Sequence, residues 1–190
     1  AALGLAGLES AAPAKNFAQA FENAREQGFK TLAHAGETVG PESIWDTLKY
    51  LKPDRIGHGV RAVEDEKLLD ELNRLQIPLE VCPHSNLHTL GLAPAQHPIG
   101  LLYRSGFNVT LNTDNRLMSN VSMTGEYEVG AKEYGLDFHD LEKVTINSMK
   151  SSFLPYNQRL SVIYDTLKPG FARLREELGV ASLSTSPTAP

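Results

Sequence analysis

The sequence of 190 residues contains one cysteine and one tryptophan, and no apolar run approaches the roughly 20 residues of a membrane span. A single cysteine excludes an intramolecular disulfide framework and fits a reducing compartment, so we expect a cytoplasmic protein. A basic block is also lacking, because 18 Lys and Arg stand against 23 Asp and Glu, for a net charge of −5. A mildly acidic chain of this kind is a poor candidate for binding nucleic acid or an anionic membrane.

The sequence has no initiator methionine, and its first seven residues are almost wholly apolar. This opening run has the character of a buried strand. Chain termini usually lie at the protein surface, so a chain that starts within a core strand is unusual. We therefore expect the sequence to be a piece of a longer protein.

Short apolar runs alternate with helix-like segments up to residue 111. This alternation predicts right-handed crossovers and a parallel sheet. After residue 114 the pattern becomes purely helical, and the last helix, 156–178, is expected to be interrupted around Pro169 and Gly170. Strands are expected at 1–7, 31–34, 55–57, 77–81 and 107–111, and helices at 16–27, 41–52, 64–75, 99–105, 122–134, 138–151 and 156–178.

Ionisable residues follow the ends of three of these expected strands: His34 with Glu37, then His58, then Asp114. In parallel α/β folds the chemistry lies at the carboxyl ends of the strands. Neutral imidazole and carboxylate suit zinc, and His34 and Asp114 can supply two ligands. A catalytic zinc takes three or more, so the others must come from elsewhere. Glu37 lies beyond the flexible Gly36 and can face the same pocket as a proton shuttle.

Five motifs follow one another along the chain: Leu5-Ala6-Gly7, His34-Ala35-Gly36-Glu37, Ile56-Gly57-His58-Gly59, Cys82-Pro83 with Ser85-Asn86, and Leu111-Asn112-Thr113-Asp114. In this order they resemble the C-terminal half of adenosine deaminases, a family of the zinc-dependent amidohydrolase superfamily, in its bacterial form. The resemblance covers nearly the whole chain apart from the tail. It implies an α/β fold, a partial TIM (β/α)8 barrel with about five of eight strands and extra C-terminal helices over 1–180. The Ser, Thr and Pro content of the tail predicts disorder at 181–190.

The resemblance implies that the complete protein hydrolyses adenosine and deoxyadenosine to inosine-type products and ammonia with a water activated by Zn²⁺, while this chain alone is inactive. By resemblance, His34 and Asp114 are zinc ligands, and Glu37 is the acid that protonates purine N1. His58 orients the activated water and stabilises its charge. The backbone of Gly7 donates to purine N3.

Two departures from the family pattern stand out. Where many members have a second aspartate that contacts purine N7, this sequence has Asn115, whose NH2 group can donate to N7 at any pH, so we expect binding to survive. The His-x-His pair of the family's first strand is missing. We therefore expect the metal site to need the N-terminal barrel half or another chain.

Two alternatives stay open at this stage. One is deamination of another adenine-bearing compound, such as adenine or aminodeoxyfutalosine, because the strand-end motifs are shared across that group. The other is a non-catalytic half-barrel that serves as a remnant or an interaction module. The missing His-x-His pair motivates the second, and the retained ionisable residues count against it. The sequence leaves the oligomeric state undetermined.

The remaining polar and sulfur-bearing residues have simpler interpretations. Cys82 is expected to be a small buried apolar residue. His84 and His88 are expected to be polar loop residues, because Pro83 and the loop-like Ser85-Asn86 argue against a helix. His97 and His139 are expected at the surface. Two methionines are expected to pack near the site or the core. These residues are His84, His88, His97, His139, Met118 and Met123.

Overall fold

The computed structural model of the protein describes residues 1–180, so the tail expected at 181–190 lies outside the described residues. The chain divides into two compact units, Ala1–Phe153 and a second unit that begins at Leu154. The first unit holds the sheet and all the proposed site residues. Among residues 1–180, no helix combines the length and apolar character that crossing a membrane requires.

The sheet of the first unit is fully parallel, as the strand-helix alternation predicted. Each strand pairs with the next one along the chain, in the order β1-β2-β3-β4-β5. The register places Leu5 beside Ala33 and His34 beside Gly57, so the carboxyl ends of neighbouring strands lie together. The strands are β1 (Ala2–Leu5), β2 (Lys30–Ala35), β3 (Arg55–His58), β4 (Leu79–Val81) and β5 (Val109–Leu111).

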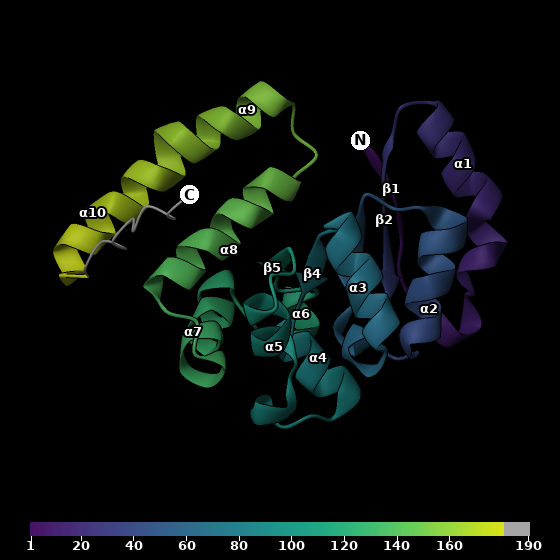
Figure 1. Ribbon diagram of the computed structural model, residues 1–190, viewed down its shortest axis with the longest axis horizontal. Coiled ribbons are helices and arrows are strands. Elements are labelled where there is room, and N and C mark those ends of the chain that lie inside the picture. Colours follow the sequence, from purple (N-terminus) through teal and green to yellow (C-terminus); the bar gives the residue numbers. More distant parts are fainter. Residues whose placement is uncertain (181–190) are drawn as a thin grey trace, which may run out of the picture. The chain divides into compact units, whose positions relative to one another are not determined.

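Helices follow every strand, and Figure 1 shows α1 and α2 running beside β1 and β2. In the first unit these are α1 (Ala18–Glu26), α2 (Pro41–Asp46), α3 (Glu66–Leu75), α4 (Pro83–Leu90), α5 (Ile99–Arg104), α6 (Arg116–Ser119), α7 (Met123–Tyr134) and α8 (Phe138–Ser151). The second unit contains α9 (Tyr156–Ser161) and α10 (Lys168–Leu178). A π-helical segment continues α2 over Thr47–Leu51.

The main core lies between the strands and the helices that follow them. Strand residues Ile56, Leu79 and Val109 are fully buried against it. In α3, Leu68 and Leu72 lie on the face that is buried in this core. The side chain of Asp65 caps α3 by accepting the N–H groups of Lys67 and Leu68, which satisfies donors that a helix start leaves free. Other members of the core are Ile44, Leu102, Leu111, Leu136 and Val144.

The structure corrects the prediction for residues 83–90, which form the helix α4 and not a loop. Pro83 stands in the first turn of α4, where a residue without N–H loses no intrahelical hydrogen bond. Gly91 ends the helix at φ +62°. The proline that argued against a helix is therefore its start signal.

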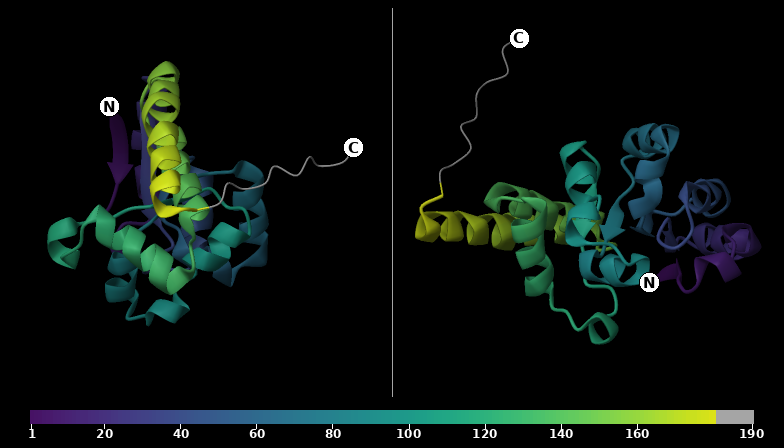
Figure 2. Two further views of the ribbon diagram at one scale, coloured as in Figure 1. Left: turned by 90° about the vertical axis from the view of Figure 1, so that its left-hand side faces the viewer. Right: turned by 90° about the horizontal axis from the view of Figure 1, so that it is seen from below.

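The last predicted helix is also different, because it continues without interruption through Pro169. A π-helical segment, Val162–Leu167, joins α9 to α10, and Figure 2 shows the continuous helical ribbon. The carbonyl that the ring of Pro169 would strike in a regular helix belongs to Asp165, which lies within this wider segment. The altered hydrogen-bond spacing lets the helix pass the proline.

Two packing predictions were wrong. In residues 1–180 the side chains of β1 alternate between exposed and partly buried and β1 pairs only with β2, so the described residues do not bury the strand as expected. Met118 and Met123 are 80% and 40% exposed. Met118 lies on α6, a helix of four residues, and has no buried face to occupy in the described part of the chain.

Candidate active site

The two histidines at the ends of β2 and β3 lie together, as the strand-end motifs predicted. The rings of His34 and His58 meet edge to face with their centroids 4.7 Å apart. Gly57 makes the room for this arrangement, because a Cβ at that position would lie 2.5 Å from Cδ2 of His34. The first glycine of the Gly-His-Gly motif, Gly57, therefore leaves the space that the His34 ring occupies.

Asn86 connects the carboxyl group of Glu37 to His58. The sequence places Asn86 in a motif and predicts no role for it. Asn86, fully buried on α4, has its Nδ2 3.1 Å from Glu37 Oε1 and 3.0 Å from His58 Nδ1. The direct distance from His58 Nδ1 to Glu37 Oε1 is 3.6 Å. The amide of Asn86 thus bridges the two groups.

Asp114, after β5, is held by the same helix. Its Oδ2 accepts a hydrogen bond of 2.7 Å from the hydroxyl of Ser85, one residue before Asn86. Asp114 and His58 both adopt left-handed backbone angles, with φ of 52° and 64°. Such angles are uncommon outside glycine and concentrate at functional positions. Helix α4 therefore orders residues from three strand ends.

Burial shifts the pKa values of these groups in opposite directions. Desolvation lowers the pKa of His34, with a further decrease from His58, and it lowers the pKa of His58 as well. Desolvation raises the pKa of Glu37, and the nearby charge of Asp114 adds to the increase. Neutral imidazoles beside a carboxyl group that holds its proton more tightly are suited to acid-base chemistry.

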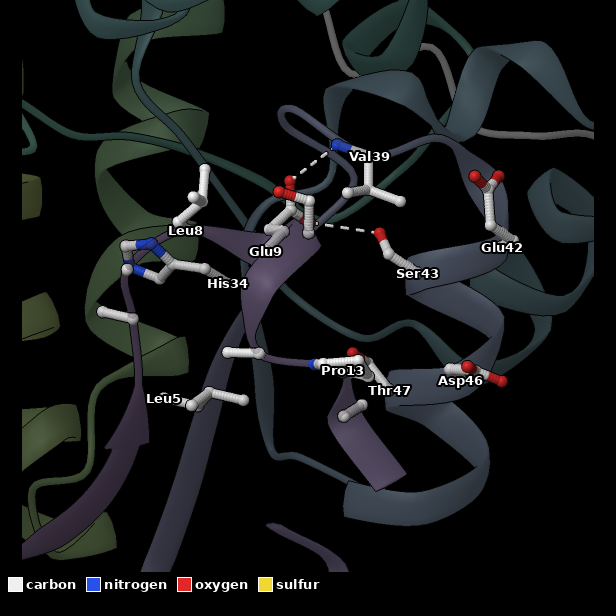
Figure 3. A pocket seen from close by; sticks show the side chains of 15 residues that line it. Leu5, Leu8, Glu9, Pro13, His34, Val39, Glu42, Ser43, Asp46 and Thr47 are labelled. Atoms are coloured by element: carbon white, nitrogen blue, oxygen red, sulfur yellow. Dashed lines mark hydrogen bonds between the residues drawn. The ribbon is translucent and has the colours of Figure 1, made fainter. Parts of the chain in front are cut away.

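A cavity of about 160 Å³ opens beside His34 at the carboxyl ends of β1 and β2. Figure 3 shows His34 on one side of it and Ser43 and Thr47 of the following helical segment on the other. Gly7 lines the cavity with φ +116°, an angle that side chains rarely adopt. The backbone at Gly7 is therefore open to a ligand.

The donor set of the site fits zinc in kind and falls short in number. His34 offers an imidazole nitrogen and Asp114 a carboxylate oxygen, which are ligands that zinc takes in catalytic sites. Within residues 1–180, however, no three His, Cys, Asp or Glu side chains form a group that could hold a metal ion. The described residues thus offer two donors of a kind that zinc takes, without a complete ligand set.

Comparison with known proteins decides the family, since the model of the adenosine deaminase family matches residues 1–168. This chain belongs to the adenosine deaminase family. Adenosine deaminase 1 of Streptomyces coelicolor is 42% identical to it over 186 residues, which cover 91% of this chain and 47% of that protein. The chain spans about half the length of the curated relatives it matches.

Solved structures of related enzymes share the fold. An adenine deaminase from Arthrobacter aurescens matches with a TM-score of 0.86 and 28% identity, covering 90% of this chain and 53% of its own. An amidohydrolase from Burkhoderia ambifaria with bound Zn has a TM-score of 0.85, 23% identity, and coverage of 94% and 50%. An Arabidopsis protein complexed with IMP has a TM-score of 0.78, 22% identity, and coverage of 93% and 50%. The five-stranded sheet is thus part of a TIM (β/α)8 barrel.

Sequence reasoning missed Glu9, which fixes the loop that carries Glu37 in this member of the adenosine deaminase family. Its Oε2 accepts the backbone N–H groups of Glu37 at 3.1 Å, Thr38 at 2.5 Å and Val39 at 3.0 Å. Its Oε1 accepts from the hydroxyl of Ser43 at 3.1 Å, and Figure 3 shows the bonds to Val39 and Ser43. Its position two residues after the Leu-Ala-Gly motif was the available signal.

Replacing Glu9 with Gln is expected to lower the free energy of unfolding by about 1–2 kcal/mol at neutral pH, because an amide oxygen accepts these donors more weakly than a carboxylate does. Burial raises the pKa of Glu9, but hydrogen bonds from Val39 and Thr38 outweigh it and hold the pKa below its ordinary value of 4.5. The carboxylate therefore stabilises the fold fully above pH 4.5, and this stabilisation is lost as the pH falls through the lowered pKa.

Urea unfolding of the full-length protein and its variant at several pH values measures this difference. Glu26→Gln, an exposed change on α1, is the matched control and is expected to have little effect. If the difference in unfolding free energy between the parent protein and Glu9→Gln were the same in acid as at neutral pH, the prediction would be wrong.

Gly36 makes the turn between the proposed ligand His34 and Glu37. It has φ +68°, and a Cβ at this position would overlap Cδ1 of the buried Ile44. We expect Gly36→Ala to destabilise the full-length protein by about 2–4 kcal/mol in urea unfolding, combining the cost of the left-handed angle with overpacking. Gly28→Ala separates the two causes, because Gly28 has φ +77° and open space around it. An equal loss in both variants would show that overlap with Ile44 contributes nothing.

The structure also corrects the prediction for His97, which is buried and not a surface residue. Its ring packs against that of Tyr134 at 5.3 Å, and burial lowers its pKa to about 4. Pro98 and Ile99, which follow His97, begin the mostly buried helix α5. The polarity of His97 alone does not indicate that it lies beside a buried helix. His139, predicted alongside it, is partly buried.

Two smaller predictions were resolved. Cys82 is buried as expected, and desolvation raises the pKa of its thiol, so it is unsuited to be a nucleophile. His84 lies on α4, where its Nδ1 is 3.1 Å from the fully buried carboxyl group of Glu126 on α7. This contact ties α4, which holds the site residues, to the helices that follow the sheet.

Proposed function

We propose that the protein to which this chain belongs hydrolyses adenosine and deoxyadenosine to the corresponding 6-oxo nucleosides and ammonia. The observation that carries the proposal is the cluster of Glu37, His58 and Asn86 at adjacent strand ends, beside His34 and Asp114. Membership of the adenosine deaminase family supports the reaction class. In this proposal residues 1–180 are the C-terminal part of the catalytic barrel, working in the cytoplasm.

His34 and Asp114 would hold a zinc ion in the complete site. Zinc supplies a water molecule with a lowered pKa, which is the nucleophile such a reaction needs. Two ligands are too few for a catalytic zinc, so the others would come from outside this chain, either from a preceding barrel half or from another chain. Gly57 keeps the His34 ring free of steric conflict, and Ser85 orients Asp114.

Glu37 is proposed to protonate N1 of the purine, which makes C6 electrophilic. Its raised pKa favours the proton-carrying form, and the Glu9 carboxylate fixes its backbone. His58 is proposed to orient the attacking water with its ring. The water oxygen adds to C6, one of its protons passes to the 6-amino group, and breaking of the C6–N bond releases ammonia. The other water proton returns to the carboxylate of Glu37.

The purine edge would meet Gly7 and Asn115. The backbone N–H of Gly7 is proposed to donate to purine N3. Asn115 caps α6 with its Oδ1, which accepts the N–H groups of Leu117 and Met118. The cap uses only the oxygen of the amide, so its NH2 group is proposed to donate to N7.

Adenine is the second candidate substrate, because the matched structure from Arthrobacter aurescens is an adenine deaminase. The test is ammonia release by the full-length protein, loaded with zinc, from adenosine, deoxyadenosine, adenine and aminodeoxyfutalosine. We expect the highest kcat/KM for the nucleosides. Faster release from adenine would favour the second candidate, and no release from any substrate by a zinc-loaded protein would favour a non-catalytic module.

A further inference from the structure

A buried chain of hydrogen bonds leads from His97 to the proposed catalytic pair. His97 Nε2 lies 3.3 Å from Asn86 Oδ1, and Asn86 Nδ2 lies 3.0 Å from His58 Nδ1 and 3.1 Å from Glu37 Oε1. His97, Asn86 and His58 are 6%, 0% and 1% exposed. Groups so deeply buried must satisfy one another, and the direction of each bond is set within the chain.

The backbone of Ile99 fixes the direction at one end. Its N–H donates to His97 Nδ1 at 3.2 Å, so this nitrogen is an acceptor and carries no proton. Burial keeps His97 neutral, with a pKa of about 4, and its single proton must therefore be on Nε2. The Nε2–H group faces Asn86, which has to accept through its Oδ1.

A second backbone group confirms the orientation of the amide. The N–H of Cys82 lies 3.4 Å from the same oxygen, Asn86 Oδ1, and it can only donate. With its oxygen occupied by two donors, Asn86 has only the two hydrogens of its NH2 group left to offer. One points to His58 Nδ1 and the other to Glu37 Oε1.

The consequence is a defined proton position on each partner. His58 Nδ1 accepts, so the proton of the neutral ring is on Nε2. Glu37 Oε1 also accepts, so the bond from Asn86 favours Oε2 as the position of a proton carried by this carboxyl group, whose other side-chain partner is Thr89. His58 and Glu37 cannot share a proton directly, because 3.6 Å between them is too long for a hydrogen bond.

We propose that His97 and Asn86 are positioning residues that place the proton of His58 on Nε2 and the proton of Glu37 on Oε2. This inference rests on the proposed function, in which Glu37 delivers a proton and His58 orients the attacking water. We call the hydrogen bonds from His97 through Asn86 to His58 and Glu37 the relay. Without the relay, the neutral ring of His58 could carry its proton on either nitrogen, and only one of these two forms presents Nε2–H. The relay thus removes the wrong form before the substrate binds.

Two substitutions of His97 separate the relay from simple packing. The amide nitrogen of His97→Gln can reach the place of Nε2 and donate to Asn86. His97→Asn reaches only the place of Nδ1, where it can still accept from Ile99. In the zinc-loaded full-length protein we expect His97→Asn to lower kcat about tenfold with little change in KM, and His97→Gln to stay within about threefold of the parent. Equal activity of both variants and the parent would overturn the proposal, as would a loss with Gln larger than with Asn.

Nitrogen NMR of the histidine rings in the full-length protein reads the proton positions without requiring turnover. We expect His58 to show a bare Nδ1 and a protonated Nε2 in the parent, and Asn86→Asp to move the proton to Nδ1, because the carboxylate accepts where the amide donated. A protonated Nδ1 in the parent would refute the relay even if the variants fail to fold. A parent that shows the expected ring form but deaminates none of the substrates supports the relay and rejects the proposed function.

Discussion

Glu37→Gln is expected to lower kcat for adenosine by about 10²–10⁴-fold in the zinc-loaded full-length protein, the range that a general acid contributes. Gln has the size of Glu and retains an oxygen that can accept from Asn86, so the fold and the relay survive. It cannot deliver a proton to N1 of the purine. Substrate binding is expected to change far less, so the loss falls on kcat and not on KM.

Two controls accompany this prediction. Glu26→Gln makes the same chemical change at an exposed position of α1, away from the cavity beside His34, and is expected to retain the parent's kcat. Zinc content of the Glu37→Gln protein, measured by elemental analysis, should equal that of the parent, because Glu37 is not a proposed ligand. A variant that keeps its zinc and more than a tenth of the parent's kcat would remove Glu37 from the role of acid.

The second large effect concerns the chain by itself. We expect the 190-residue chain to show no measurable deamination of adenosine and to bind zinc far more weakly than the full-length protein, because it offers His34 and Asp114 as its only proposed ligands. In the described residues β1 and β5 each pair on one side only, so free sheet edges are also expected to promote association. Ammonia release, zinc content and size-exclusion chromatography of both proteins measure these effects.

A stable and active zinc-loaded monomer of this chain would contradict that expectation. Activity that appears only when the chain is mixed with the preceding segment of the full-length protein would agree with it, since the missing ligands are then supplied in trans. The His34→Ala form of the full-length protein is the matched comparison, because it removes one proposed ligand and leaves every sheet edge as it was.

The sequence predicted the sheet and the grouping of His34 with His58 because both depend on short-range patterns. Apolar runs that alternate with amphipathic helices leave few arrangements other than a parallel sheet. Parallel strands bring their carboxyl ends to one edge, so residues in separate motifs become neighbours. The proximity of His34, Glu37 and His58 follows from that rule alone. Residue chemistry alone indicated His34 as a zinc ligand and Glu37 as a proton shuttle, whereas the role of His58 came from the family resemblance.

The relay could not be predicted, because it depends on side chains meeting across elements. Asn86 reaches Glu37 and His58 only because residues 83–90 form a helix, and the proline that starts the helix was taken as evidence against it. His97 is polar and follows a short loop, features that usually place a residue at the surface. Its ring packs against Tyr134, whose position along the chain gives no sign of the contact.

At His58 and Asp114, the left-handed backbone angles lower the stability of the fold, while the side chains are needed for the proposed activity. Each angle costs a residue other than glycine roughly 1–2 kcal/mol. A glycine at either position would relieve that strain and delete a proposed site group in the same step. Variants selected for heat resistance alone should therefore often carry glycine in place of His58 or Asp114. Variants selected for both heat resistance and activity should keep the two residues. In this fold, evolution would be expected to keep an unfavourable backbone wherever the deaminase chemistry depends on it.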